Sequence, residues 1–242
     1  NRGNLYRLKG DYNKAISDYS EALKLKPDYA EVYYNRAVVY DILKDYNKSL
    51  ADYTGAIEYK PDYVEALYNR AIIYDMAGDY NKALADLTQA IKYKADYIEA
   101  YQNRGNIYYK TGMYDNAFND FNRLLTINPG FAKGYISRGT IYTDTGRYSD
   151  ALKDFNKAIE IDPHSIEAFN GRGTVYGLMS DYNRAIEDFT KALSIDKNSV
   201  QSYYNRAFTY MKKGDYTKAR EDVKKLESSG YKVDKSVFKE IY

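Results

Sequence analysis

Apolar and small side chains recur at helical spacing along the chain, in pairs of stretches separated by a short polar turn. Leu67 and Ala71 lie on one face of a first helix, and Ala83 and Leu87 lie on one face of a second. A spacing of four residues places side chains on the same side of a helix, whereas a strand would alternate them between two faces. The pattern therefore predicts two antiparallel helices joined by a turn.

The same pattern repeats almost seven times along the chain, with a period of 34 residues. A unit of this size cannot bury its apolar face alone, so such units stack on one another and share a continuous core. We expect an all-α solenoid of about seven antiparallel helix-turn-helix repeats, and we count residues 1–242 as a single domain. The repeats are 1–29, which is truncated at its start, 30–63, 64–97, 98–131, 132–165, 166–199 and 200–233.

The turn inside each repeat has its own residue preferences. Gly78 lies between helices expected over about 63–77 and about 80–93, where a left-handed residue ends the first helix at little cost. Lys44 and Ser180 take this position in two repeats, so we expect some backbone strain there. An aspartate follows the turn and is expected to cap the second helix. These aspartates are Asp11, Asp45, Asp79, Asp181 and Asp215.

The junction between repeats also carries signals. Pro61 stands where the second helix must stop, because proline lacks the N–H group that a helix interior needs. Asp62 and Glu65 follow with the spacing of a capping box, which predicts that Asp62 caps the next helix.

One pair of opposite charges is present in every repeat. An arginine at the seventh position and an aspartate at the twenty-third lie symmetrically about the turn, so antiparallel helices bring them level. We expect a partly shielded Arg–Asp pair in each repeat, since the planar guanidinium matches a carboxylate better than lysine does. Equivalent pairs in every repeat indicate architecture rather than catalysis. The pairs are Arg2–Asp18, Arg36–Asp52, Arg70–Asp86, Arg104–Asp120, Arg138–Asp154, Arg172–Asp188 and Arg206–Asp222.

The amino-acid composition argues against two classes of function, nucleic-acid binding and membrane insertion. The net charge of +2 comes without a dominant basic patch, which argues against nucleic-acid binding. Residues 1–121 carry 16 Lys/Arg against 18 Asp/Glu, and the rest carry 20 against 16, so the second half is the more basic. No apolar run approaches the roughly 18 residues of a membrane span, so no membrane insertion is expected.

The cellular compartment stays open. The chain has no cysteine, which excludes disulfides and slightly favours the cytoplasm while remaining compatible with the periplasm or the extracellular space. It begins inside a repeat, which suggests a piece of a longer protein.

The repeat resembles the tetratricopeptide repeat (TPR) family. The family's usual leucine at the seventh position is replaced by arginine, and the chain has no tryptophan. The resemblance implies a right-handed superhelix in which the first helix of each repeat lines a concave groove, followed by a C-terminal capping helix that starts within 234–242. The residues that match the family's landmarks in one repeat are Tyr135, Gly139, Tyr142, Ala151, Phe155, Ala158 and Pro163.

The resemblance also implies which positions of the first helix face the groove. The sixth position is mostly asparagine, and a file of side-chain amides can hold the backbone of a peptide because each amide both donates and accepts hydrogen bonds. This resembles the asparagine ladder of O-linked N-acetylglucosamine transferases. The alternative is that these amides bond a neighbouring helix or only water. Ser137 and Gly171 interrupt the file, whose members are Asn35, Asn69, Asn103 and Asn205.

Tyrosines and aspartates complete the predicted peptide-binding site. Asp41 and Asp75, both at the twelfth position, make the amino-terminal part of the groove acidic and would favour basic residues of a ligand. A solvated charge pattern without a ligand is the alternative. Four tyrosines occupy groove positions where the core does not require them, and such rings are good interface anchors. They are Tyr34, Tyr68, Tyr109 and Tyr204.

The function that we expect is therefore a protein–protein interaction scaffold that holds a peptide or helix of a partner protein in its groove. No enzymatic activity, metal or cofactor is expected, because the one histidine, His164, lies in a turn beside Pro163 and cysteine is absent. Two alternatives stay open. The chain could be the substrate-recognition arm of a larger enzyme, for example a glycosyltransferase, or a solenoid that associates with itself through its end repeats.

Overall fold

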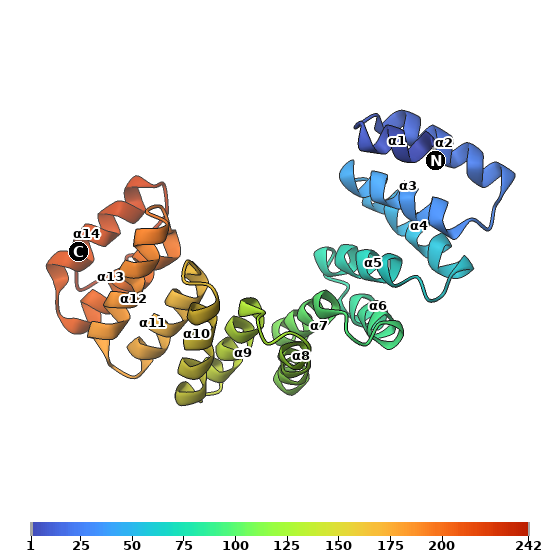
Figure 1. Cartoon of the computed structure of the whole chain (residues 1–242). Coiled ribbons are helices and arrows are strands. Elements are labelled where there is room, and N and C mark those ends of the chain that lie inside the picture. The colour runs from blue at the N-terminus through green and yellow to red at the C-terminus, as the bar shows by residue number, and fades with distance from the viewer. Residues whose placement is uncertain (1, 242) are drawn as a thin grey trace. The chain divides into compact units, whose positions relative to one another are not determined.

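The computed structural model describes residues 2–241, which form fourteen helices and no strand (Figure 1). The predicted all-α fold is confirmed. Odd-numbered helices are the first helices of the repeats, here called A helices, and even-numbered helices are the second, or B helices. The bounds are α1 (Arg2–Leu8), α2 (Tyr12–Leu25), α3 (Ala30–Ile42), α4 (Tyr46–Tyr59), α5 (Val64–Met76), α6 (Tyr80–Tyr93), α7 (Ile98–Lys110), α8 (Tyr114–Ile127), α9 (Ala132–Asp144), α10 (Tyr148–Ile161), α11 (Ile166–Leu178), α12 (Tyr182–Ile195), α13 (Val200–Lys213) and α14 (Tyr216–Ser228).

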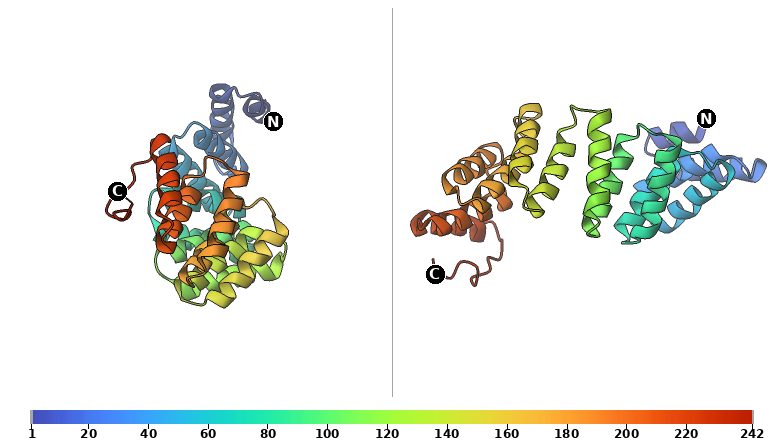
Figure 2. Two further views of the ribbon diagram at one scale, coloured as in Figure 1. Left: turned by 90° about the vertical axis from the view of Figure 1, so that its left-hand side faces the viewer. Right: turned by 90° about the horizontal axis from the view of Figure 1, so that it is seen from below.

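The helices belong to two compact units. Of the described residues, 2–120 form unit 1 and 121–241 form unit 2, with the boundary inside α8. Within each unit, the helices of one repeat pack on each other and on the next repeat, which is the arrangement of a helical repeat solenoid (Figure 2). Each helix pair falls inside one of the expected 34-residue repeats. A single continuous array over 1–242 stays a prediction.

The turn inside each repeat contains a left-handed residue, as predicted. Gly78 has a φ of 77°, and Lys44 and Ser180 reach 59° and 63° without being glycine. A side chain in this conformation costs about 1 kcal/mol. The other glycines with positive φ at this turn are Gly10, Gly112, Gly146 and Gly214.

The two predicted kinds of helix cap have different outcomes. The carboxylate of Asp79 accepts a hydrogen bond from the backbone N–H of Lys82 at 3.3 Å and caps α6, as predicted. The capping box is wrong, because the residue at the start of α5 is Tyr63 and Asp62 lies one position too early. The ring of Tyr63 packs instead, with Lys60 Nζ 4.5 Å from its centroid. The other confirmed aspartate caps are Asp11, Asp45, Asp181 and Asp215.

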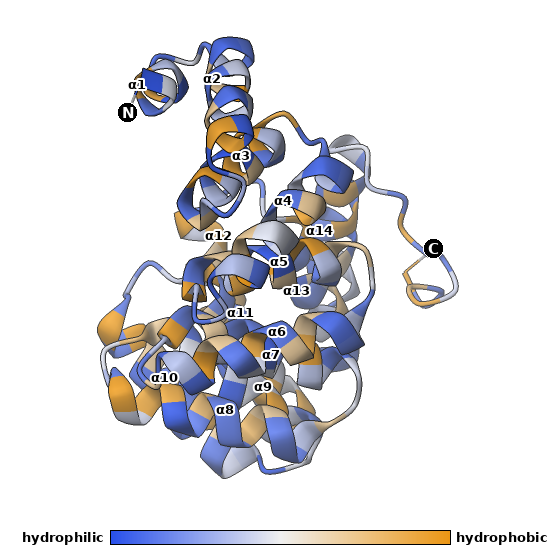
Figure 3. Cartoon of the chain, turned by 90° about the vertical axis from the view of Figure 1, so that its right-hand side faces the viewer, coloured by the Kyte–Doolittle hydropathy of each residue, from blue (hydrophilic) through white to orange (hydrophobic). Residues whose placement is uncertain are grey.

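Small residues let helices and rings pack closely. The ring of Phe155 is 1% exposed and lies between Gly139 of its own repeat and Gly171 of the next. A Cβ on Gly139 would approach the ring to 3.2 Å, and one on Gly171 would overlap it. This contact explains why Gly171 interrupts the file of asparagines. In Figure 3 hydrophobic and hydrophilic residues alternate along the same helices, as expected for helices that bury one face.

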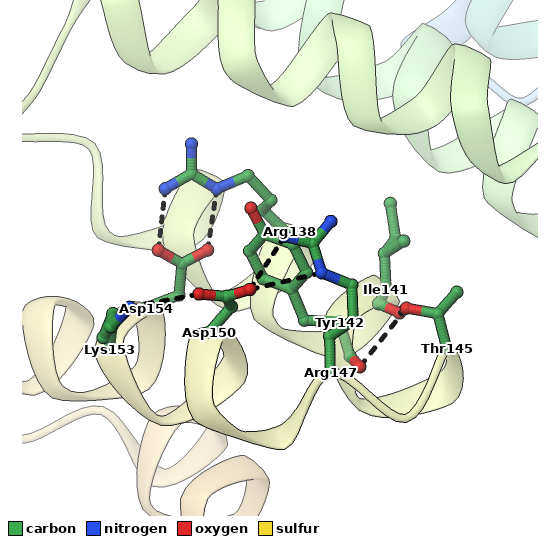
Figure 4. Close-up of polar contacts among 8 residues, drawn as sticks. All are labelled: Arg138, Ile141, Tyr142, Thr145, Arg147, Asp150, Lys153 and Asp154. Atoms are coloured by element: carbon green, nitrogen blue, oxygen red, sulfur yellow. Dashed lines mark hydrogen bonds and ion pairs between the residues drawn. The ribbon is translucent and has the colours of Figure 1, made fainter.

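The predicted Arg–Asp pairs are confirmed in every repeat. The Nε and one terminal nitrogen of Arg138 donate to the two carboxylate oxygens of Asp154, each at 2.7 Å (Figure 4). From Arg36–Asp52 onward the aspartate side chains are only 6% to 9% exposed. The hydrogen bonds to Asp52 raise the pKa of the Arg36 guanidinium, as expected for a shielded ion pair.

A third hydrogen bond from the same arginines joins consecutive repeats, and the sequence did not reveal it beforehand. Arg36 donates through its remaining terminal nitrogen to the Ser20 hydroxyl at 2.8 Å, and Arg138 donates to the Asn122 amide oxygen at 2.7 Å. The acceptor is a short polar side chain on the preceding B helix. One guanidinium therefore connects three helices. The remaining acceptors are Thr54, Thr88, Asn156 and Thr190.

The C-terminal segment covers the last repeat without forming the expected capping helix. Residues 235–241 form turns, and residue 242 lies outside the described part of the chain. Phe238 is fully buried and Ile241 is 4% exposed, both packed against residues of α13 and α14.

Local hydrogen bonds hold this segment in turns. The Asp234 carboxylate accepts hydrogen bonds from the backbone N–H and the hydroxyl of Ser236, at 2.9 and 2.7 Å. The Val237 N–H donates to the carbonyl of Asp234 at 3.1 Å, and the Ile241 N–H donates to the carbonyl of Phe238 at 2.9 Å, as in turns.

Exchange of the turn residue tests the strain at Lys44. The variant Lys44→Gly removes a side chain from a left-handed position and should stabilise the protein by about 0.5–1 kcal/mol. The converse change, Gly78→Lys, should destabilise it by a similar amount. Urea unfolding followed by far-UV circular dichroism measures both. A lower unfolding midpoint for Lys44→Gly would contradict this account.

Removal of one arginine tests the connection between repeats. Arg70→Leu leaves the Asp86 carboxylate shielded and unpaired and also breaks the bond to Thr54, so the free energy of unfolding should fall by about 3 kcal/mol. The matched control is Arg2→Leu, because the Arg2 side chain is 76% exposed and its loss should matter much less. Equal thermal unfolding midpoints for the two variants would show that the pairs are not structural.

Candidate functional site

Side chains on consecutive A helices of unit 1 contact one another across a step of 35 residues. Asn69 on α5 donates to the Tyr34 hydroxyl on α3 at 3.4 Å. Asn103 on α7 donates to the Tyr68 hydroxyl on α5 at 2.7 Å. We call these four residues the polar file. Its members come from the predicted peptide-binding site, so the structure brings these predicted residues together.

The amide N–H groups of the file are used within the protein. Asn69 also donates to the Tyr53 hydroxyl at 3.2 Å. Bonding to a neighbouring helix was the alternative to a peptide-binding ladder, and it holds for the N–H groups of Asn69 and Asn103. The amide oxygens of these two residues accept no hydrogen bond from other described residues. These oxygens can therefore accept a further hydrogen bond.

The other two predicted asparagines lie apart from the file. Asn35 donates to the carbonyl of Glu31 at 2.7 Å, inside its own helix. Asn205 accepts from the Gln201 side chain at 2.8 Å and belongs to unit 2. The asparagines therefore have different surroundings despite their equal positions in the repeat.

The tyrosines of the file are held in aromatic pairs. The ring of Tyr34 lies 4.8 Å from that of Tyr63, and the ring of Tyr68 lies 5.1 Å from that of Tyr97. Burial raises the pKa of Tyr34 and of Tyr68, although the asparagine N–H donors oppose this. Burial also raises the pKa of Tyr63, to about 12. These hydroxyls therefore stay protonated near neutral pH.

The two remaining predicted tyrosines pack elsewhere. The ring of Tyr109 lies 5.6 Å from that of Tyr114. Tyr204 contacts the C-terminal segment, with its ring 6.4 Å from Tyr231 and 5.4 Å from Phe238. Tyr204 thus takes part in covering the last repeat.

The two predicted aspartates are satisfied in different ways. Asp41 accepts hydrogen bonds from the hydroxyls of Ser49 and of Tyr53, the latter at 2.6 Å, and both donors lie on α4. Among the described residues no cation pairs with Asp41, so its negative charge is not compensated locally. The sequence signal was present, because Ser49 occupies a fully buried position that is alanine in the other repeats.

Asp75 lacks such hydroxyl donors and has a cation instead. Its repeat places Ala83 and Leu87 where Asp41 finds Ser49 and Tyr53. Lys110 Nζ lies 3.1 Å from the Asp75 carboxylate, again across 35 residues. The pair is partly exposed and neutralises the charge of Asp75.

A hollow in unit 1 lies beside the polar file and has a volume of about 550 Å³. Its rim contains Ile42 and Met76, which are 46% and 63% exposed. Both lie at the thirteenth position of their repeats and were not among the predicted site residues, although an apolar residue at an exposed helical position is a usable sequence signal. We call this the unit 1 hollow. It is lined by Val38, Asp41, Ile42, Tyr46, Tyr53, Tyr68, Asn69, Ile72, Ile73, Met76 and Asn103.

The described part of the chain contains no cluster of three or more His, Cys, Asp or Glu side chains placed to hold a metal ion. It also contains no helix with the length and apolar character that crossing a membrane requires.

Models of the tetratricopeptide repeat match the chain in overlapping stretches. The model described as TPR repeat matches residues 3–41 and 76–112. Models described as tetratricopeptide repeat match residues 30–63, 53–85, 98–131, 132–165, 166–199 and 189–221. No match was found among curated proteins.

Solved structures with the same architecture cover much of the chain. A tetratricopeptide repeat protein from Parabacteroides merdae is 25% identical with a TM-score of 0.74, over 99% of this chain and 94% of that one. MamA is 28% identical with a TM-score of 0.64, over 67% and 95%. YrrB, described as a TPR protein with an unusual peptide-binding site, is 20% identical with a TM-score of 0.65, over 77% and 96%, and shows the fold alone.

The repeat matches, the helix pairs and these structures agree. The chain belongs to the tetratricopeptide repeat family, whose helical solenoid is typical of protein–protein interaction scaffolds.

Proposed function

We propose that the chain is a scaffold that binds an extended segment of a partner protein in the unit 1 hollow, and that this segment carries a basic residue. The family supports an interaction function, and the described residues supply no constellation for catalysis. YrrB, which shares the fold, is described as having a peptide-binding site.

The charge of Asp41 carries the proposal. This carboxylate lines a hollow whose walls include the apolar side chains of Ile42 and Met76, and no described cation neutralises it. Apolar walls strengthen the attraction between charges because they exclude water. A lysine or arginine of a ligand would place its charge near Asp41 and its aliphatic stem against these walls.

The polar file supports binding of the ligand backbone. The amide oxygens of Asn69 and Asn103 can accept hydrogen bonds from peptide N–H groups, while their own N–H groups stay bonded to tyrosines. The tyrosines thus orient the amides. In this proposal the backbone bonds are independent of the ligand's sequence, and Asp41 supplies the preference for a basic residue.

The remaining predicted residues lie on A helices but do not line the hollow. Tyr34 belongs to the file, and Asn35, Tyr109 and Asp75 lie on the A helices of unit 1. Asp75 contributes less charge because it is paired with Lys110.

Binding to an array of unrelated peptides tests this function. The double variant Asn69→Ala/Asn103→Ala should lose about tenfold in affinity for basic and neutral peptides alike, since two backbone hydrogen bonds are removed. The variant Asp41→Asn should weaken only the basic peptides. Fluorescence anisotropy of selected labelled peptides gives the dissociation constants.

The matched control is Asn47→Ala, because Asn47 is exposed on α4 and does not line the hollow. Circular dichroism must show that every variant is folded. If wild type and the double variant bind all peptides equally, the asparagines do not hold a ligand backbone. If Asp41→Asn leaves the preference for basic peptides intact, the charge assignment is wrong.

A further inference from the structure

Gly177 is a helical glycine that packing does not explain. It lies in the last turn of α11, and a Cβ added there would meet nothing within 4 Å apart from its chain neighbours and the backbone of its own helix. The nearby Gly173 is different, because its Cβ would approach the Phe189 ring to 2.7 Å. Glycine makes a helix less stable than alanine does, so Gly177 lowers stability without any gain in internal packing.

The open space above Gly177 belongs to a hollow in unit 2 with a volume of about 410 Å³. Two large apolar side chains on its walls are exposed to solvent, Leu178 by 54% and Phe208 by 36%. Such a space is sufficient for a large side chain of a ligand. We call this the unit 2 hollow. It is lined by Gly173, Thr174, Gly177, Leu178, Ser180, Tyr182, Phe189, Asn205, Phe208, Thr209 and Lys212.

The two hollows occupy the same place in the repeat. Each is formed by the ninth, twelfth and thirteenth positions of one A helix, by its B helix, and by the A helix of the next repeat. The twelfth position is Asp41 in unit 1 and Gly177 in unit 2. A carboxylate therefore occupies the first hollow, whereas the second is open at that point.

The two hollows also carry charged side chains of opposite sign. Lys212 lines the unit 2 hollow, where no acidic side chain is present. Its ammonium lies 5.3 Å from the centroid of the Phe208 ring and pairs with no acidic side chain in the described part of the chain. A ligand with a carboxylate next to its apolar group would complement this arrangement.

From these observations we infer that the unit 2 hollow is a second peptide-binding site, which takes a large apolar side chain flanked by an acidic residue. Gly177 keeps the space open for the apolar side chain, with Leu178 and Phe208 as its walls. Lys212 binds the neighbouring carboxylate. The site does not depend on the unit 1 hollow, and either proposal can fail alone.

The absence of tryptophan from the chain allows a direct test. The probe is a short synthetic peptide in which tryptophan stands between aspartate and glutamate, in a glycine–serine frame with blocked ends. The tryptophan emission should shift to shorter wavelength on binding to wild type. Two matched peptides, one with lysines in place of the acids and one with alanine in place of tryptophan and a terminal dye, should bind about tenfold more weakly.

Substitutions in the unit 2 hollow test whether the peptide binds there. Gly177→Leu fills the hollow and should weaken binding of the acidic tryptophan peptide by about tenfold or more. Gly177→Ala should weaken binding of this peptide by a smaller factor, and the unfolding midpoint of the variant should be at least as high as that of wild type. If the glycine were needed only for packing, its replacement would lower the unfolding midpoint. Lys212→Gln should reduce the preference for the acidic over the basic peptide.

The matched control is Thr143→Leu, at the twelfth position of α9 and outside the hollow's lining, which should bind like wild type. Asp41→Asn should also leave this binding unchanged, and this separates the result from the fate of the unit 1 proposal. Failure of the acidic tryptophan peptide to bind wild type, or equal affinity for wild type and Gly177→Leu, would overturn the inference.

Discussion

Each repeat after the first depends on an arginine whose guanidinium connects three helices at once. Two of its N–H groups bind a shielded aspartate on the B helix of the same repeat, and a third binds a short polar side chain on the preceding B helix. Because the guanidinium is planar and rigid, these bonds fix the relative rotation of the helices as well as their distance. A leucine at this position would bury apolar surface, but it would not fix the relative rotation of the helices. A shielded ion pair adds little net stability over apolar packing, so its contribution lies in fixing one arrangement of the helices.

The residues beside the unit 1 hollow serve both the stack and the proposed ligand. Tyr68 accepts from Asn103, and Asp75 pairs with Lys110, so the same face holds consecutive A helices together. A binding face built in this way is largely preorganised, because its side chains already have fixed partners. What remains for a ligand is a reduced set of groups: amide oxygens, the charge of Asp41 and exposed apolar side chains at the rim.

Much of the fold could be predicted from the sequence, because the period, the turn glycines and the Arg–Asp pairs are local patterns that recur. Lys44 and Ser180 adopt the strained conformation that their position required. The sequence did not predict some other features that depend on contacts between helices. The third arginine bond depends on how repeats stack. An aspartate at the twelfth position is bound by the hydroxyls of Ser49 and Tyr53 in one case and by the ammonium of Lys110 in the other. The shape of the hollows depends likewise on what neighbouring helices leave unfilled at Gly177 and around Asp41.

The acceptors of the third arginine bond affect how a repeat chain of this kind can gain or lose whole repeats. They are serine, threonine or asparagine at one position, and each arginine binds whichever of them the preceding repeat supplies. This hydrogen bond is therefore generic and carries no information about which repeats it joins. Duplication or loss of a whole 34-residue unit would place another arginine opposite an equivalent acceptor. Sequence divergence can thus be concentrated in the hollows while this bond is kept between consecutive units.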